Sequence, residues 1–176
     1  MRGKFKVSKY IFAVVVILLG IVTQCRAADE DDALRFAIGA YNDGFYDVAE
    51  PGFAGFVKKY PYSKHRPYAL YLLGVTRFMK NDFNGAKATL TELNDLYPKN
   101  ERKASASYFL GESAYLTDDY KLARVSYHYV YKNPPDEISR STVLYRVGEL
   151  NFLAGDYKGA KAALSTYDWL LRGDRR

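Results

Sequence analysis

The chain has 176 residues, with 26 lysines and arginines against 20 aspartates and glutamates, and a single cysteine. Most of the basic excess lies in the first 27 residues, which carry five basic side chains and no acid. The remainder is nearly neutral, so the basic isoelectric point does not indicate a nucleic-acid-binding protein. No basic stripe with interleaved aromatic residues is left outside that segment.

The first predicted element is an export signal over residues 1–27. A basic start precedes an apolar run over residues 11–22, and Cys25–Ala27 supplies the small residues that a signal peptidase requires before Ala28. This run is shorter than the roughly 20 residues that cross a bilayer as a helix. We therefore expect cleavage, with a retained membrane anchor as the alternative. Gln24 disfavours lipidation of Cys25, because a lipoprotein signal has a small residue there, and the mature chain would contain no cysteine.

Beyond residue 28, a period of 37 residues recurs through four copies without a gap. Four columns of like residues define it, two of small and two of aromatic side chains. The columns are Ala37, Gly74, Gly111 and Gly148; Ala49, Ala86, Ala123 and Ala160; Tyr46, Phe83, Tyr120 and Tyr157; and Tyr41, Phe78, Tyr115 and Phe152. Such a fixed period is typical of repeat architectures.

Each copy is predicted to form a helical hairpin. Apolar residues recur at helical spacing on both sides of a short polar turn such as Asn81-Asp82. The small residues let two antiparallel helices approach closely, and the aromatic residue after the turn fills the wedge between them. One hairpin cannot bury its apolar face alone, so the copies must stack. The predicted fold is an all-α solenoid of about four helix-turn-helix hairpins over residues 28–176, with copies at about 30–61, 67–98, 104–135 and 141–172.

These residues resemble the tetratricopeptide repeat, whose pattern is Leu-Gly, then Gly-Asp-Tyr, then Ala and a closing Pro. The copy at 67–98 carries "LLG", "NDF" and "YP" in that order, and the resemblance covers residues 30–172. The period exceeds the usual length of about 34 residues by three. The longer links are similar to those of two families of exported bacterial repeat proteins, the outer-membrane assembly lipoprotein BamD and the Tol-Pal-associated YbgF. The resemblance implies a protein-binding role in the cell envelope.

Two copies depart from the pattern. In the first copy, Pro51, Gly52 and Gly55 fall within the expected second helix, which predicts a helix that starts late, near Glu50, or one that kinks at the proline. In the last copy no polar capping helix follows, so we expect an apolar end face that could dock a partner or a second copy. The alternatives are that the last helix itself caps the array, or that the chain is part of a longer one. The predicted end-face residues are Tyr167, Trp169 and Leu170.

The resemblance also implies a concave wall, built by the first helix of each hairpin, as the partner-binding surface. Rigid amphipathic tyrosines suit such a surface. The candidate residues are Leu34, Tyr71, Tyr108 and Tyr145 at one level; Ile38, Val75, Glu112 and Glu149 at a second; and Tyr41, Phe78, Tyr115 and Phe152 at a third. For the third level a core position is the favoured alternative. The two glutamates could attract a basic ligand, or could simply be solvated.

Catalysis is not expected. The two histidines, His65 and His128, lie in a link and on a second helix, and no cluster has metal-ligand spacing. We expect no catalytic residue, no cofactor, no metal and no nucleic acid. The sequence predicts a non-catalytic scaffold in the periplasm or on the periplasmic face of the outer membrane, with a protein or peptide segment as its partner. The alternatives are self-association through the C-terminal end, and an accessory domain of an enzyme system that processes envelope polysaccharide.

Overall fold

The computed structural model describes residue 12 and residues 29–173 of the chain, so nearly all of the predicted export signal lies outside it. The described part contains eight helices and no strand. They are a helix over residues 29–42, followed by α2 (Tyr46–Lys59), α3 (Arg66–Met79), α4 (Phe83–Leu96), α5 (Lys103–Tyr115), α6 (Tyr120–Lys132), α7 (Arg140–Leu153) and α8 (Tyr157–Gly173). Among these residues, no helix is both long and apolar enough to cross a membrane.

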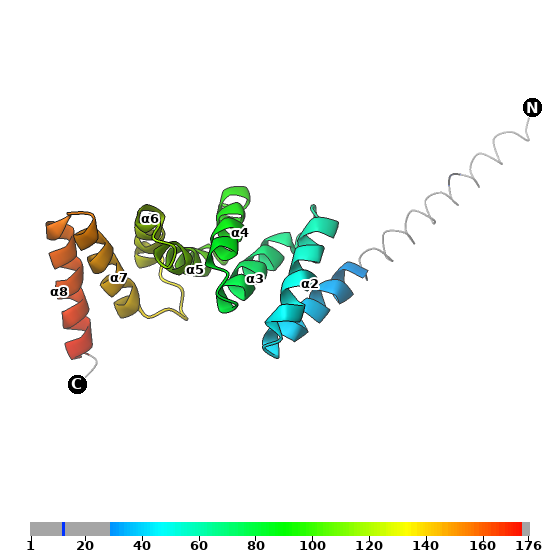
Figure 1. Ribbon diagram of the computed structural model, residues 1–176, viewed down its shortest axis with the longest axis horizontal. Coiled ribbons are helices and arrows are strands. Elements are labelled where there is room, and N and C mark those ends of the chain that lie inside the picture. Colours follow the sequence, from blue (N-terminus) through cyan, green and yellow to red (C-terminus); the bar gives the residue numbers. More distant parts are fainter. Residues whose placement is uncertain (1–11, 13–28, 174–176) are drawn as a thin grey trace, which may run out of the picture.

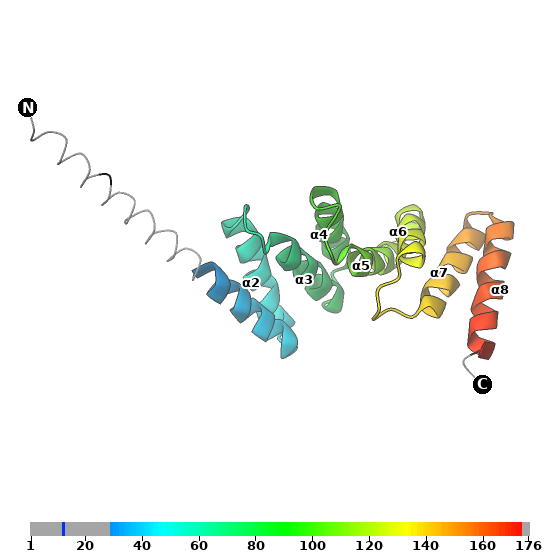
Figure 2. The ribbon, with the colours of Figure 1, turned by 180° about the vertical axis from the view of Figure 1, so that it is seen from behind.

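The helices pair into hairpins that follow one another along an elongated array (Figures 1 and 2). Each helix from α2 onward contacts the next, and α3 also contacts α5 directly. The helix over residues 29–42 and α8 lie at opposite ends. The predicted all-α solenoid is therefore confirmed for the described residues.

The small-residue columns lie where helices approach most closely, as predicted. All four alanines of the second column are buried, at 4 % exposure or less. A methyl group added at Gly74 would lie 2.6 Å from the side chain of Leu90, and one added at Gly148 would lie 2.7 Å from that of Leu164. Since real Cβ atoms do not approach to such distances, an alanine at either position would force the facing leucine to move.

The first copy corrects one prediction. Helix α2 begins at Tyr46 and runs through Pro51, so the expectation of a late start near Glu50 is wrong. Pro51 lies in the second turn of α2 with its ring exposed, and Asp47, whose carbonyl loses its bond, is exposed as well. Water can therefore satisfy that carbonyl. Gly52 has a packing role, because a methyl group there would lie 2.9 Å from the Cβ atom of Ala37.

The turn within each hairpin repeats its backbone geometry. The residue two before the second helix adopts a positive φ in every copy: Gly44 at 78°, Asn81 at 62°, Asp118 at 59° and Gly155 at 77°. The next residue caps the second helix through its side chain in three copies. Asp82 accepts from the Gly85 N–H at 2.9 Å, Asp119 from that of Leu122 at 3.2 Å, and Asp156 from that of Gly159 at 2.9 Å. The capping role predicted for the turn is confirmed there, whereas Phe45 fills this place in the first copy without a side-chain cap.

Candidate partner-binding surface

The tyrosines predicted for the first level lie on the first helices of successive hairpins. Tyr71 and Tyr108 are half-buried, and Tyr145 is 46 % exposed. The Arg102 guanidinium lies 5.4 Å from the centre of the Tyr71 ring, and burial raises the pKa of Tyr71. All three rings are partly exposed to solvent, and each is held by a helix. Leu34 differs from them: it is only 6 % exposed and packs with Phe53 in the core, so its assignment to the groove is wrong.

The third-level rings pack within their own hairpins. Each lies against the aromatic residue that follows the turn, with ring centres 5.7 Å apart for Tyr41 and Tyr46 and 5.5 Å apart for Phe78 and Phe83. The same pairing recurs at 5.8 Å and 5.5 Å in the last two copies. In the first three copies these rings are half-buried, which supports the core alternative, whereas Phe152 in the last copy is 60 % exposed.

A residue of the following copy covers the rings of the second and third copies. Phe109 on α5 lies 5.4 Å from Phe78 on α3, and Arg146 on α7 lies 4.3 Å from the ring centre of Tyr115 on α5. Phe109 and Arg146 occupy the same column, 37 residues apart, as do the two rings that they cover. No further copy follows Phe152 in the described chain, which explains its exposure.

Glu112 and Glu149 belong to a charge network centred on Arg146. The Arg146 guanidinium lies 3.6 Å from Glu112 and 3.1 Å from Glu149. The hydroxyl of Tyr127 donates to Glu112, and that of Tyr115 donates to Glu149 at 2.8 Å. Burial and then the bond to Glu112 raise the pKa of Tyr127. A basic ligand would therefore have to compete with Arg146 for both carboxylates.

The C-terminal residues do not share one face. Trp169 is 70 % exposed and occupies the column of Lys58, Asp95 and Lys132, all exposed, so it lies away from the surface that stacking covers. Tyr167 and Leu170 pack partly against the core beside Val143 and Leu144. Sequence reasoning missed Leu164, which is 38 % exposed although its equivalents in the other copies are completely buried. The period itself, extended to this column, could have identified it.

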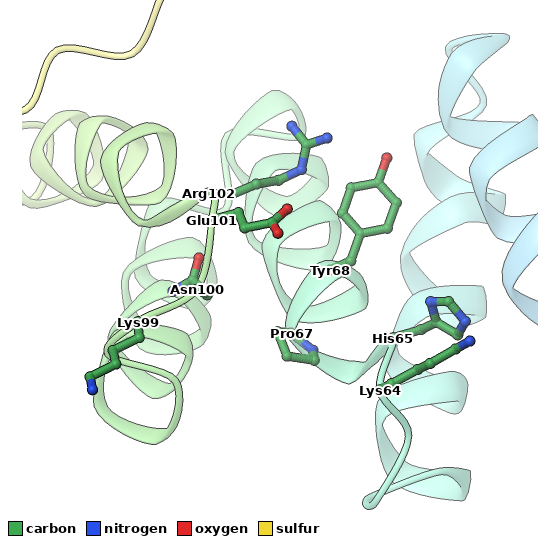
Figure 3. A pocket seen from close by; sticks show the side chains of 8 residues that line it. All are labelled: Lys64, His65, Pro67, Tyr68, Lys99, Asn100, Glu101 and Arg102. Carbon is green, nitrogen blue, oxygen red and sulfur yellow. The ribbon is translucent and has the colours of Figure 1, made fainter.

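An open cavity of about 430 Å³ lies between two links, where sequence reasoning placed only spacers (Figure 3). The Arg102 guanidinium lies 4.9 Å from the ring centre of Tyr68 at this cavity. His65 lines it, whereas His128 lies half-buried on α6. Within the described part of the chain, no group of His, Cys, Asp and Glu residues could hold a metal ion. The lining residues are Lys64, His65, Pro67, Tyr68, Lys99, Asn100, Glu101 and Arg102.

Comparison with known proteins agrees with this geometry. The family profile described as tetratricopeptide repeat matches residues 68–100, which hold most of the hairpin of α3 and α4. This match identifies residues 68–100 as one tetratricopeptide repeat. Among curated protein sequences, none matches the chain.

Solved structures share the tetratricopeptide repeat fold over most of the chain. The structure titled MamA AMB-1 has a TM-score of 0.70 at 20 % identity, covering 96 % of this chain and 86 % of its own. A tetratricopeptide repeat protein from Parabacteroides merdae has a TM-score of 0.65 at 15 % identity, covering 77 % of this chain and 51 % of its own. BtubC from P. vanneervenii has a TM-score of 0.64 at 16 % identity, covering 83 % of this chain and 64 % of its own. This chain thus spans about half the length of the P. merdae protein, and at these identities the likeness concerns the fold.

Proposed function

We propose that this protein is a non-catalytic scaffold of the bacterial cell envelope that binds a segment of a partner protein on the tyrosine surface of its first helices. The observation that carries the proposal is the series Tyr71, Tyr108 and Tyr145. These rings recur every 37 residues on successive first helices, and each keeps exposed area while being held in place by its neighbours. Ordered amphipathic rings bind with little loss of conformational entropy.

Charge pairing in this surface favours an apolar or mixed partner segment over a strongly basic one. Arg146 already pairs with Glu112 and Glu149, and Arg102 lies over Tyr68 and Tyr71. An extended or helical segment that places apolar side chains between the tyrosines would bury aromatic area without breaking these pairs. Tetratricopeptide repeat proteins commonly serve as protein-binding scaffolds, and the comparisons indicate no enzyme family.

The envelope location rests on the sequence of residues 1–27 and on the similarity of the links to those of BamD and YbgF. A basic start, a short apolar run and small residues before Ala28 are the features of an export signal. Mass spectrometry of the protein recovered from fractionated cells would test this part. An N-terminus at Ala28 in the periplasmic fraction supports it, whereas an intact, unprocessed chain in the cytoplasm contradicts it.

Site-specific photo-crosslinking in cells would test the binding surface. A photoreactive residue would replace Tyr145 in one strain and Tyr62, which is fully exposed on a link, in the control strain. We expect a discrete cross-linked protein from position 145 only, and its loss when Tyr71 and Tyr108 are changed to alanine. Identical products from both positions, or no product from position 145, would contradict the proposed surface.

A further inference from the structure

Apolar contacts hold each junction between copies together. Leu73, Leu110 and Val147 occupy one column of the first helices and are only 4–5 % exposed. They pack against the second helix of the preceding copy, as Leu110 does in the cluster that contains Leu90 and Leu93 of α4. Every junction therefore joins an apolar face of a first helix to an apolar face of the preceding hairpin.

The two ends of the array each leave one of these faces uncovered. At the N-terminal end, Phe36 occupies the column of Leu73 and is 67 % exposed. At the C-terminal end, Leu164 occupies the column of Leu90 and is 38 % exposed, whereas Leu90 is completely buried. Phe36 and Leu164 thus mark the two unmatched halves of an interface that recurs inside the chain.

The last junction contains a cation–π contact, and the residues equivalent to its two partners lie at the two ends of the array. Arg146 covers the ring of Tyr115 at 4.3 Å. Arg35 occupies the column of Arg146 in the first helix, and Phe152 occupies the column of Tyr115 in the last copy. Both side chains are exposed, Arg35 at 73 % and Phe152 at 60 %, and the Arg35 guanidinium pairs with Asp32 at 2.8 Å. This pair does not prevent the same cation–π contact, because Arg146 also pairs with a carboxylate, that of Glu149, while it lies over Tyr115.

The charges at the two ends are complementary as well. At the first junction, Lys80, which follows α3 directly, pairs with Asp47 of α2 at 2.8 Å. Asp43 occupies the column of Lys80 in the first copy, and Lys158 occupies the column of Asp47 in the last one. Compared with the first junction, the two ends therefore carry an acid in the place of the lysine and a lysine in the place of the acid. Lys161 adds a second cation, because its equivalent Lys87 bonds Thr117, the equivalent of Asp43, at 3.0 Å. Within the described residues, Asp43, Lys158 and Lys161 form no ion pair.

We propose that a second copy of this chain is the occupant of the C-terminal end: the helix over residues 29–42 of one copy docks on α7 and α8 of the next and continues the stack. Phe36 then packs beside Leu164, Arg35 covers Phe152, and Asp43 pairs with Lys158 and Lys161. The two faces differ, so the contact is head-to-tail and adds copies in a chain unless the rotation closes a ring.

Two surface variants of the full chain would test this arrangement by sedimentation velocity over a range of concentrations, in one mild detergent throughout. Phe36→Asp removes the N-terminal face, and Lys158→Asp with Lys161→Asp removes the charges of the C-terminal face. All three positions are exposed, so the fold should survive, and circular dichroism checks this. We expect the first change to raise the dissociation constant by at least about tenfold, and the second by about tenfold at low salt.

Mixing the two variants gives the decisive result. Each retains the face that the other lacks, so we expect the mixture to form a dimer that does not extend. Adding Asp43→Lys to the chain with Lys158→Asp and Lys161→Asp should restore assembly, because the charge pair is rebuilt with its signs exchanged. A wild-type chain that stays monomeric at every concentration overturns the proposal. So does a Phe36→Asp chain that assembles like wild type, which is the result expected for contact between two C-terminal ends or through residues 1–28.

Discussion

Leu90 and Leu164 occupy the same place in the second and last copies, yet only one of them is part of a core. Both lie against a glycine of their own hairpin, Gly74 or Gly148, at nearly the same distance. Leu90 is completely buried because α5 packs over it, while Leu164 is 38 % exposed because no described helix covers it. Burial in this array is therefore a property of the junction between copies, since one hairpin alone leaves this face open.

The largest effect is expected from truncating these two leucines. Leu90→Ala should lower the free energy of unfolding by about 3 kcal/mol, because it removes packed atoms and leaves a cavity between α3, α4 and α5. Leu164→Ala should cost about 1 kcal/mol or less, because water already reaches that side chain. Urea denaturation followed by circular dichroism measures both. Equal losses for the two variants would show that the end copy is covered in solution.

The charge network gives a smaller effect, with a pH dependence. Tyr127→Phe removes the hydroxyl that donates to Glu112 and should cost about 2 kcal/mol at neutral pH, since that bond is made to a charged group. Burial raises the pKa of Tyr127 in the folded chain, while the unfolded chain loses this proton near pH 10. The stability from the protonated phenol is therefore complete below about pH 10 and is lost as pH rises through the raised pKa.

Unfolding measured across alkaline pH would show this dependence. The wild-type protein should lose stability above about pH 10 more steeply than Tyr127→Phe. Tyr62→Phe is the matched control, because it removes the same hydroxyl from a side chain that is fully exposed. If Tyr127→Phe and the wild type have the same slope, the buried phenol is not the cause.

The smallest effect is expected at the turns, where the end copies and inner copies carry different residues. Gly155 adopts a φ of 77°, so Gly155→Ala should cost about 1 kcal/mol, because a Cβ atom is strained in that region. Asn81→Gly, at the same position of an inner copy, should change the stability by no more than about 0.5 kcal/mol, because asparagine tolerates this conformation and glycine is entropically costly. Thermal unfolding of both variants measures the difference. A neutral Gly155→Ala would mean that the last turn relaxes.

The first copy shows where sequence reasoning succeeded and where it failed. The period predicted that Ala37 and Ala49 are buried, and both are completely buried. The proline in this copy predicted a second helix that starts late or kinks, and the late start is wrong because α2 forms from Tyr46 onward. A proline costs a helix one backbone hydrogen bond, but here the carbonyl that loses its bond, that of Asp47, is exposed to water. Gly52 was read as a helix-weakening residue, but its contact with Ala37 depends on how two helices cross, which spacing alone does not give.

The candidate surface was also predicted only in part from the sequence. Period and residue type were sufficient to place Tyr71, Tyr108 and Tyr145 on equivalent first helices, because a helix fixes which residues share a face. They were not sufficient to separate Leu34, which is buried, from those tyrosines, because burial depends on Phe53 of the partner helix. The sequence also placed Glu112 and Glu149 one repeat apart without showing that Arg146 lies between them.

The sequence by itself determined the hairpins, their number and the positions of the small residues, because these follow from a local helical period and from the turn chemistry repeated every 37 residues. Only the tertiary structure decided which equivalent residues are covered. Leu90 and Leu164 are the same amino acid in the same local setting, and their burial differs because it depends on whether a neighbouring copy excludes water. Exclusion of water is a property of packed surfaces, and a one-dimensional pattern does not contain it.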